Sequence, residues 1–147
     1  MTIRAQPLDR EDLPILRAAL AAAGLPVDDL DEPGRTFYAI LDHRSRTIGY
    51  GGLERFGANA LLRSVVVPPR ERGLGQGGVI VETLEREAAA HGVGTIYVLT
   101  TDAAGFFARL GYSSIDRASV PASIAATAQF GTLCPVTAVV MRKRLGA

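Results

Sequence analysis

The sequence predicts an α/β domain built on a mixed, mostly antiparallel central sheet flanked by helices. Between residues 36 and 67, three runs rich in β-branched, aromatic and aliphatic residues are separated by short polar turns, a pattern typical of an antiparallel meander. A helical pattern precedes the next strand, so that strand must return parallel to the end of the meander. Since 147 residues, 48% of them hydrophobic, suffice for one core, we expect a single domain over 1–147.

The first part of the chain predicts a strand, a helix and a loop. Residues 2–5 suit a short strand. Asp9 is expected to cap a helix whose leucines recur at helical spacing, and Gly24 is expected to end it. The acidic, turn-like stretch 28–33 predicts a mobile surface loop.

The meander strands are expected at 36–41, 47–56 and 60–67. The last of them is apolar on both faces, which predicts a central strand covered on both sides. Three glycines inside the second strand, at 49, 51 and 52, predict a bulge or a close approach by another backbone.

The rest of the chain predicts alternating helices and strands. In order we expect a helix ending at Gly92, a strand at 95–99, a short helix carrying Phe106 and Phe107, a strand from Tyr112, a short helix at 121–128 and a last strand at 136–141.

A glycine-rich turn links the meander to the first of these helices. The strand ends in Val65, Val66 and Val67, and the turn runs Arg72, Gly73, Leu74, Gly75, Gln76 and Gly77. Glycines allow close approach to the backbone, and N–H groups at a helix N-terminus bind phosphate, so we expect the turn to hold a coenzyme pyrophosphate. The frame 73–78 also fits the Gly-x-Gly-x-x-Gly pattern of an NAD-binding module. Too little chain follows for a doubly wound sheet, which argues against that alternative.

Two motifs in this order resemble those of the GNAT acyltransferases. The turn at 72–77 matches their Arg/Gln-x-x-Gly-x-Gly/Ala motif, and residues 103–112 resemble their Ala-x-x-Phe-Tyr-x-x-x-Gly-Phe segment. The resemblance implies the GNAT-type acyl-CoA N-acyltransferase fold, acetyl-CoA as co-substrate and direct transfer of acetyl to an amine.

Four further segments, at 52–55, 61–64, 99–101 and 130–138, resemble the ArsN-type acetyltransferases found with arsenic-resistance genes. They imply a small-molecule amine acceptor, such as an amino-acid-like arsenical.

The resemblance also implies roles for residues that bind the coenzyme. Val65, Val66 and Val67 would pair their backbone with the pantetheine arm, provided that the strand at 95–99 splays away. Thr100 stands where the family often has Asn, and its hydroxyl can still hydrogen-bond the coenzyme. Phe107 stands where the family often has a tyrosine that protonates the departing thiolate, so it can only pack.

Two charged residues are candidates for the acceptor side. A general base is useful because an amine must be neutral to attack a thioester, and Glu54, at the end of a central strand, is our candidate. The alternative is a surface carboxylate paired with Arg55 or Arg63. Arg63 is an unusual charge in an apolar strand and can clamp a substrate carboxylate or oxyanion, or else pack with a partner Glu.

The composition of the chain limits which classes of partner we expect it to bind. Lys and Arg total 16 against 15 Asp and Glu, and a net charge of +1 argues against nucleic acid. The apolar runs are too short for a membrane helix, and the start does not resemble a secretory signal, so we expect a cytoplasmic protein. We expect no metal site, since His43 and His91 stand apart and the lone Cys134 suits a small core residue.

Some alternatives stay open at this stage. Within the same fold, the acceptor can instead be a protein N-terminus or lysine. Phe107 also leaves open a non-catalytic domain that senses acyl-CoA. A homodimer formed through 130–141 is a further expectation.

Overall fold

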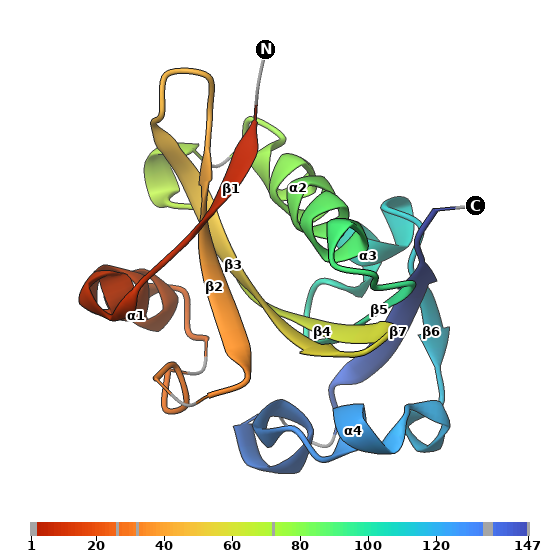
Figure 1. Ribbon diagram of the computed structural model, residues 1–147. Coiled ribbons are helices and arrows are strands. Elements are labelled where there is room, and N and C mark those ends of the chain that lie inside the picture. The colour runs from red at the N-terminus through yellow and green to blue at the C-terminus, as the bar shows by residue number, and fades with distance from the viewer. Residues whose placement is uncertain (1–2, 26, 32, 72, 134–136, 147) are drawn as a thin grey trace.

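The structure is a computed structural model that describes residues 3–25, 27–31, 33–71, 73–133 and 137–146. One sheet runs through the described chain in the strand order β1-β2-β3-β4-β5-β7-β6, with helices on both faces (Figure 1). The strands are β1 Arg4–Pro7, β2 Arg35–Leu41, β3 Thr47–Phe56, β4 Asn59–Val66, β5 Thr95–Thr100, β6 Ser113–Ile115 and β7 Val139–Arg144. The helices are α1 Leu13–Ala22, α2 Gln76–Ala90, α3 Ala104–Arg109 and α4 Ala122–Ala125, with a π-helical turn at Gln129–Leu133.

Strand pairing confirms the predicted meander and the single crossover. Strands β1 to β4 pair antiparallel in sequence order. Strand β5 follows α2 and pairs parallel with β4, and β7 then inserts antiparallel between β5 and β6. The sheet is therefore mixed and mostly antiparallel, as expected.

The entry to α1 has the predicted cap, with one turn of 3-10 helix added. The Asp9 carboxylate accepts the backbone N–H of Glu11, and the Asp12 carboxylate accepts the N–H of Asp9. This reciprocal pair is a capping box, which supplies acceptors to N–H groups that the helix itself leaves unpaired. Gly24, with φ of 72°, follows the end of the helix, as the sequence predicts.

The loop after α1 departs from the prediction of an exposed segment. Asp29 and Leu30 are only 2% and 3% exposed. Leu30 packs with Leu16 and Leu20 of α1, and Asp29 forms ion pairs with arginines of the sheet. The sequence misled because acidic, proline-bounded stretches are usually solvated, whereas here a buried counter-charge draws the carboxylate inward.

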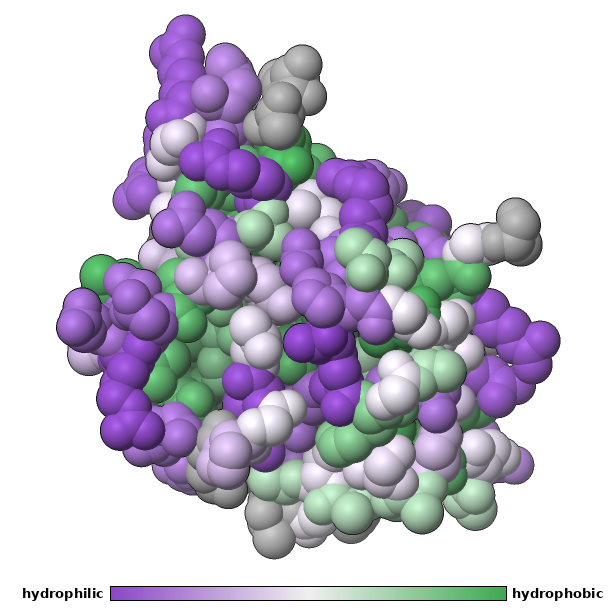
Figure 2. Space-filling model, viewed as in Figure 1, coloured by the Kyte–Doolittle hydropathy of each residue, from purple (hydrophilic) through white to green (hydrophobic). Residues whose placement is uncertain are grey.

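Hydrophobic cores lie on both faces of the sheet. Strand residues such as Leu62 and Val98 pack under α2, on the face that α3 also contacts through Phe107. Their neighbours Leu61 and Tyr97 point to the other face, against the segment that contains α4. α1 covers that second face further along the sheet. In Figure 2, hydrophobic side chains show in the hollow between α1 and the sheet.

None of the helices in the described ranges has the length and apolar character that a bilayer crossing requires.

Candidate active site at the splay between β4 and β5

The two parallel strands at the centre of the sheet separate after a short common stretch. They pair at Asn59 with Thr95, at Ala60 with Ile96 and at Leu61 with Tyr97. Beyond Leu61, β4 continues beside β3 alone, while β5 continues beside β7 as far as Thr100. The splay that the sequence analysis required is thus present. It leaves the end of β4 with backbone groups that a ligand can pair with, because buried N–H and C=O groups rarely stay unpaired.

A bulge in β4 lies inside the splay. Tyr50 pairs with Val66 and Gly52 pairs with Arg63, so two residues of β4 oppose one residue of β3. Ser64 takes the extra position with φ of 60°, a left-handed conformation that few residues other than glycine adopt. Such a bulge bends the strand and redirects its backbone groups. The sequence predicts a bulge in the glycine-bearing strand β3, and at this point the extra residue lies instead on its partner β4.

The splay encloses a cavity of about 170 Å³. Four of the predicted site residues border it, namely Arg63, Val65, Thr100 and Phe107. The other lining residues were not predicted from the sequence as site residues, and they include Leu25 and Gln129. Glu54 does not line this cavity; it lies behind Arg63. The cavity has the size of a small ligand group, and apolar side chains form much of its wall.

The glycine-rich turn opens α2 as predicted. Gly73 and Gly75 have φ of 81° and 75°, the left-handed region that favours glycine. Gly75 is the N-cap, and no side-chain hydrogen bond caps the helix among the described residues. The N–H groups of the first turn of α2, around Gln76 and Gly77, are therefore available to an anion, which the helix dipole also favours. Arg72 lies outside the described residues.

The buried carboxylate of Glu71 lies next to this turn. Glu71 is 2% exposed, and the side-chain amide of Gln76 lies 3.5 Å from its Oε1. Its Oε2 lies 3.7 Å from the guanidinium nitrogens of both Arg46 and Arg70, whose side chains are largely exposed. Leu74, at the tip of the turn, is also exposed. Glu71 thus holds two surface cations next to the proposed pyrophosphate cradle.

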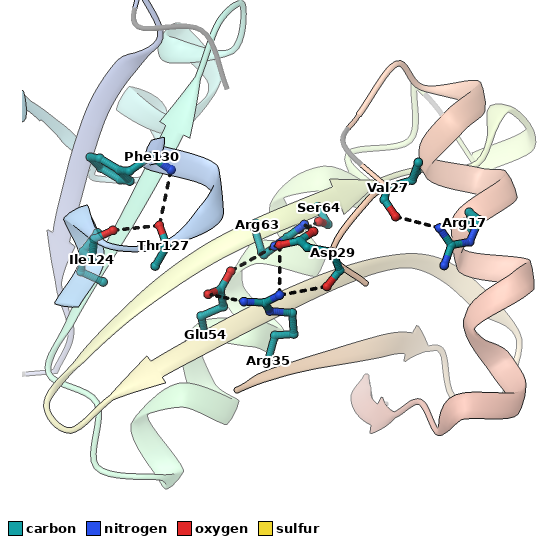
Figure 3. A network of polar contacts seen from close by, with 10 residues as sticks. All are labelled: Arg17, Val27, Asp29, Arg35, Glu54, Arg63, Ser64, Ile124, Thr127 and Phe130. Atoms are coloured by element: carbon teal, nitrogen blue, oxygen red, sulfur yellow. Dashed lines mark hydrogen bonds and ion pairs between the residues drawn. The ribbon is translucent and has the colours of Figure 1, made fainter. Parts of the chain in front are cut away.

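A cluster of four charged side chains, three of them buried, lies beside the cavity (Figure 3). Arg63 donates from both terminal nitrogens to the carboxylate of Asp29, with a distance of 2.7 Å from Nη2 to Oδ1. Its Nη1 also donates to Glu54 Oε2 at 3.0 Å, and its Nε donates to Ser64 Oγ at 3.0 Å. Arg35 bridges the two carboxylates from the other side, at 3.2 Å from Asp29 and 3.4 Å from Glu54.

Ion pairing outweighs burial for two members of this cluster, Asp29 and Arg63. Burial raises the pKa of Asp29, but the hydrogen bonds and charge of Arg63, together with the charge of Arg35, outweigh it and leave that pKa below 3.8. Burial lowers the pKa of Arg63, and the two carboxylates more than compensate, so its pKa is raised. The positive charge of Arg63 is therefore matched within the protein before any ligand binds.

Comparison with known proteins identifies the family to which this architecture belongs. Residues 33–114 match the model of the acetyltransferase (GNAT) domain. The chain belongs to the GNAT family. An uncharacterised N-acetyltransferase of Chlorobaculum tepidum is 31% identical over 99 residues, which cover 67% of this chain and 63% of that relative.

Crystal structures of GNAT proteins share the fold. An acetyltransferase of the family from Staphylococcus aureus is 17% identical with a TM-score of 0.75, over 99% of this chain and 100% of that one. The N-acetylglutamate synthase of Neisseria gonorrhoeae, crystallised with coenzyme A and N-acetylglutamate, is 14% identical with a TM-score of 0.80, over 100% of this chain and 36% of that one. At these identities the similarity shows the GNAT fold alone.

Phe107 of this GNAT chain packs against two aromatic rings. Its ring packs edge-to-face against Phe106 and Tyr112, with centroids 5.1 and 5.3 Å away. The nearby Tyr112 does not supply a free phenol, because its hydroxyl donates to Glu85 at 2.8 Å. Burial and the Glu85 charge both raise the pKa of Tyr112. Neither Phe107 nor Tyr112 therefore offers a free phenol proton at this position.

Thr100 combines a structural contact with an open donor. Its Oγ1 accepts the backbone N–H of Ala103 at 2.9 Å, which fixes the entry to α3. Because a hydroxyl can accept and donate at the same time, the O–H of Thr100 can still donate to an acceptor in the cavity.

Two further predicted residues, Val66 and Val67, do not line the cavity. Val66 pairs with Tyr50, and its side chain packs with the α1 core, whereas Val67 packs toward α2. Cys134 lies outside the described residues, as does part of the segment proposed for dimerisation. The lone arginine of β4 indicates that a carboxylate partner is needed. Nothing in the sequence indicates that Asp29, 34 positions away, is that partner.

Proposed function

We propose that this chain is an acetyl-CoA-dependent N-acetyltransferase that moves acetyl directly to the amine of a small molecule. The observation that carries the proposal is the splay between β4 and β5, whose cavity lies beside a β4 bulge and is followed in sequence by an uncapped, glycine-led helix N-terminus. This combination suits a ligand with a phosphate-bearing end and a long polar arm. The match of residues 33–114 to the GNAT domain supports the same reading.

Each part of the site has a chemical task in this proposal. N–H groups at Gly73, Leu74, Gly75, Gln76 and Gly77, with Arg72 nearby in sequence, would bind the pyrophosphate. The backbone from Val65 to Val67 would pair with the pantetheine arm, and Thr100 and Phe107 would line its inner end. The acetyl carbon would then lie in the cavity, where a neutral amine forms the C–N bond as the C–S bond breaks.

The acceptor side depends on Glu54 and Arg63. Glu54 is our proposed base, reaching the amine proton through water, because its carboxylate contacts Arg63, which lines the cavity. Most N–H groups of Arg63 already donate hydrogen bonds to Asp29, Glu54 and Ser64. One N–H on Nη2 has no acceptor among the described residues, which leaves a single donor for a substrate oxygen.

The acceptor that we favour is an amino-acid-like arsenical. The segments that resemble ArsN-type enzymes include Arg63 and Ser64 of β4 and Leu99 and Thr100 of β5, which border the cavity. A cavity of about 170 Å³ also suits a small amine better than a folded protein. These two observations support the finer assignment.

Thiol release from acetyl-CoA tests the proposal. The panel consists of 2-amino-4-arsonobutyrate, L-glutamate, a peptide with a free α-amine and an α-acetylated peptide with a free lysine. We expect release with the arsenical amino acid above all; a preference for either peptide would favour a protein acetyltransferase. The absence of release with every amine, despite calorimetric binding of acetyl-CoA, would favour the acyl-CoA sensor that Phe107 suggests. Binding of NAD without binding of acetyl-CoA would refute the proposal.

A further inference from the structure

Gln129 is a buried polar side chain that borders the cavity. It is 4% exposed, and its amide makes no hydrogen bond to any of the residues that the structure describes. The amide is not among the buried polar atoms that lack a partner, so it opens onto the cavity, where a ligand group can pair with it. We propose that Gln129 is an acceptor-binding residue whose amide hydrogen-bonds an oxygen next to the reacting amine. This inference rests on the proposed function.

The backbone around Gln129 is fixed by a local network (Figure 3). The hydroxyl of Thr127 donates to the carbonyl of Ile124 at 2.8 Å and accepts the N–H of Phe130 at 3.4 Å. The carbonyl of Thr127 accepts the N–H of Gly131 at 3.0 Å. The side chains of Ile124 and Phe130 are buried in the core beside β5 and β7. Gln129 therefore projects from an anchored support, as a residue that positions a substrate requires.

The form of the turn agrees with a functional role. Gln129 begins a π-helical turn that runs to Leu133. Such turns are rare, and they occur frequently at functional sites. Gln129, the first residue of this turn, borders the cavity.

The side of the sheet from which Gln129 comes identifies its ligand. α2, whose N-terminus would hold the phosphates, and Phe107 of α3 pack on one face. Ile124 and Phe130, which flank Gln129, pack on the opposite face, where α1 also lies. Leu25, just after α1, borders the same cavity. A group that meets Gln129 therefore enters from the face opposite the coenzyme, which is where an acceptor must approach.

The chemistry of the wall indicates which acceptor group is recognised. The charge of Arg63 is matched by Asp29 and Glu54, so the cavity offers no free full positive charge at that point. The amide N–H of Gln129 adds a neutral donor near it. The acceptor then carries a carboxylate or carbonyl oxygen close to its amine, as an amino acid does.

Kinetics of two variants test this role. Gln129→Leu removes the amide, and Gln129→Glu keeps the shape while replacing the N–H donor with a negative charge. With the panel amine that the wild type acetylates fastest, we expect Gln129→Leu to raise KM about 10-fold, the loss of roughly one hydrogen bond, while kcat changes less than about 2-fold. Gln129→Glu should raise KM further, because its charge repels the acceptor oxygen. Gln6→Leu, at an exposed glutamine of β1, is the matched control and should leave KM unchanged.

Calorimetric binding of acetyl-CoA separates this role from a general defect. We expect all three variants to bind acetyl-CoA as the wild type does. If Gln129→Leu does not fold, the isosteric Gln129→Glu alone decides. An unchanged KM in an active enzyme, or a loss confined to acetyl-CoA binding, overturns the inference and leaves the proposed function standing. A wild type that releases no thiol with any panel amine overturns the proposed function, and this inference with it.

Discussion

The buried charge cluster allows a sharp prediction for Asp29→Asn. The substitution keeps the size of the side chain but removes the negative charge that Arg63 contacts through both terminal nitrogens. Glu54 then faces Arg35 and Arg63 alone, and one buried positive charge is left without a counter-ion. Breaking a buried ion pair by removing one partner costs about 3–5 kcal/mol. We therefore expect the free energy of unfolding at pH 7 to fall by about that amount.

Urea denaturation of the wild type and two variants measures this loss. Asp28→Asn is the matched control, since it removes the same charge from the neighbouring, exposed residue and should change the stability by less than about 0.5 kcal/mol. A loss below about 1 kcal/mol for Asp29→Asn would mean that the cluster is solvated or differently paired, and would refute the reasoning.

The pH dependence gives an independent check on the same residue. The folded-state pKa of Asp29 is lowered below 3.8, so its ionisation adds stability that is fully present above that value. This part of the stability is lost as the pH falls from 3.8 through the folded-state pKa. The difference between wild type and Asp29→Asn should therefore be constant near neutrality and shrink below about pH 4. A difference that stays constant down to pH 2 would contradict the assignment.

Three further substitutions test other parts of the site. Glu54→Gln should lower turnover about 100-fold at pH 7 and much less at high pH, where the amine is already neutral; an unchanged pH–rate profile removes Glu54 as base. Gly75→Glu places a strained residue and a negative charge at the N-terminus of α2, so calorimetry should detect no acetyl-CoA binding, and retained affinity would exclude this turn as the phosphate site. Gly49→Ala should cost about 1–3 kcal/mol in urea denaturation, because its Cβ would lie 2.7 Å from the carbonyl oxygen of Val66; an unchanged stability would show that the strands yield freely.

Local patterns in the sequence determined most of the fold. Alternating residues and polar turns define the meander, and the glycines at 73 and 75 mark the left-handed turn that opens α2. The single crossover then makes β4 and β5 parallel, because a helix between two strands of one sheet brings the chain back in the same direction. These inferences need only neighbours in the chain, and neighbours are what a sequence displays.

Only the tertiary structure decided which distant side chains meet at the acceptor side. Asp29 lies in a stretch whose composition indicates a solvated loop, yet it pairs with Arg63 because the sheet interior offers that arginine no water. Gln129 lies in a stretch without periodicity, and its place at the cavity depends on how the 117–133 segment packs on β5 and β7. The free energy of a buried charge or amide is set by what surrounds it in space, and that environment is assembled from segments far apart in the chain.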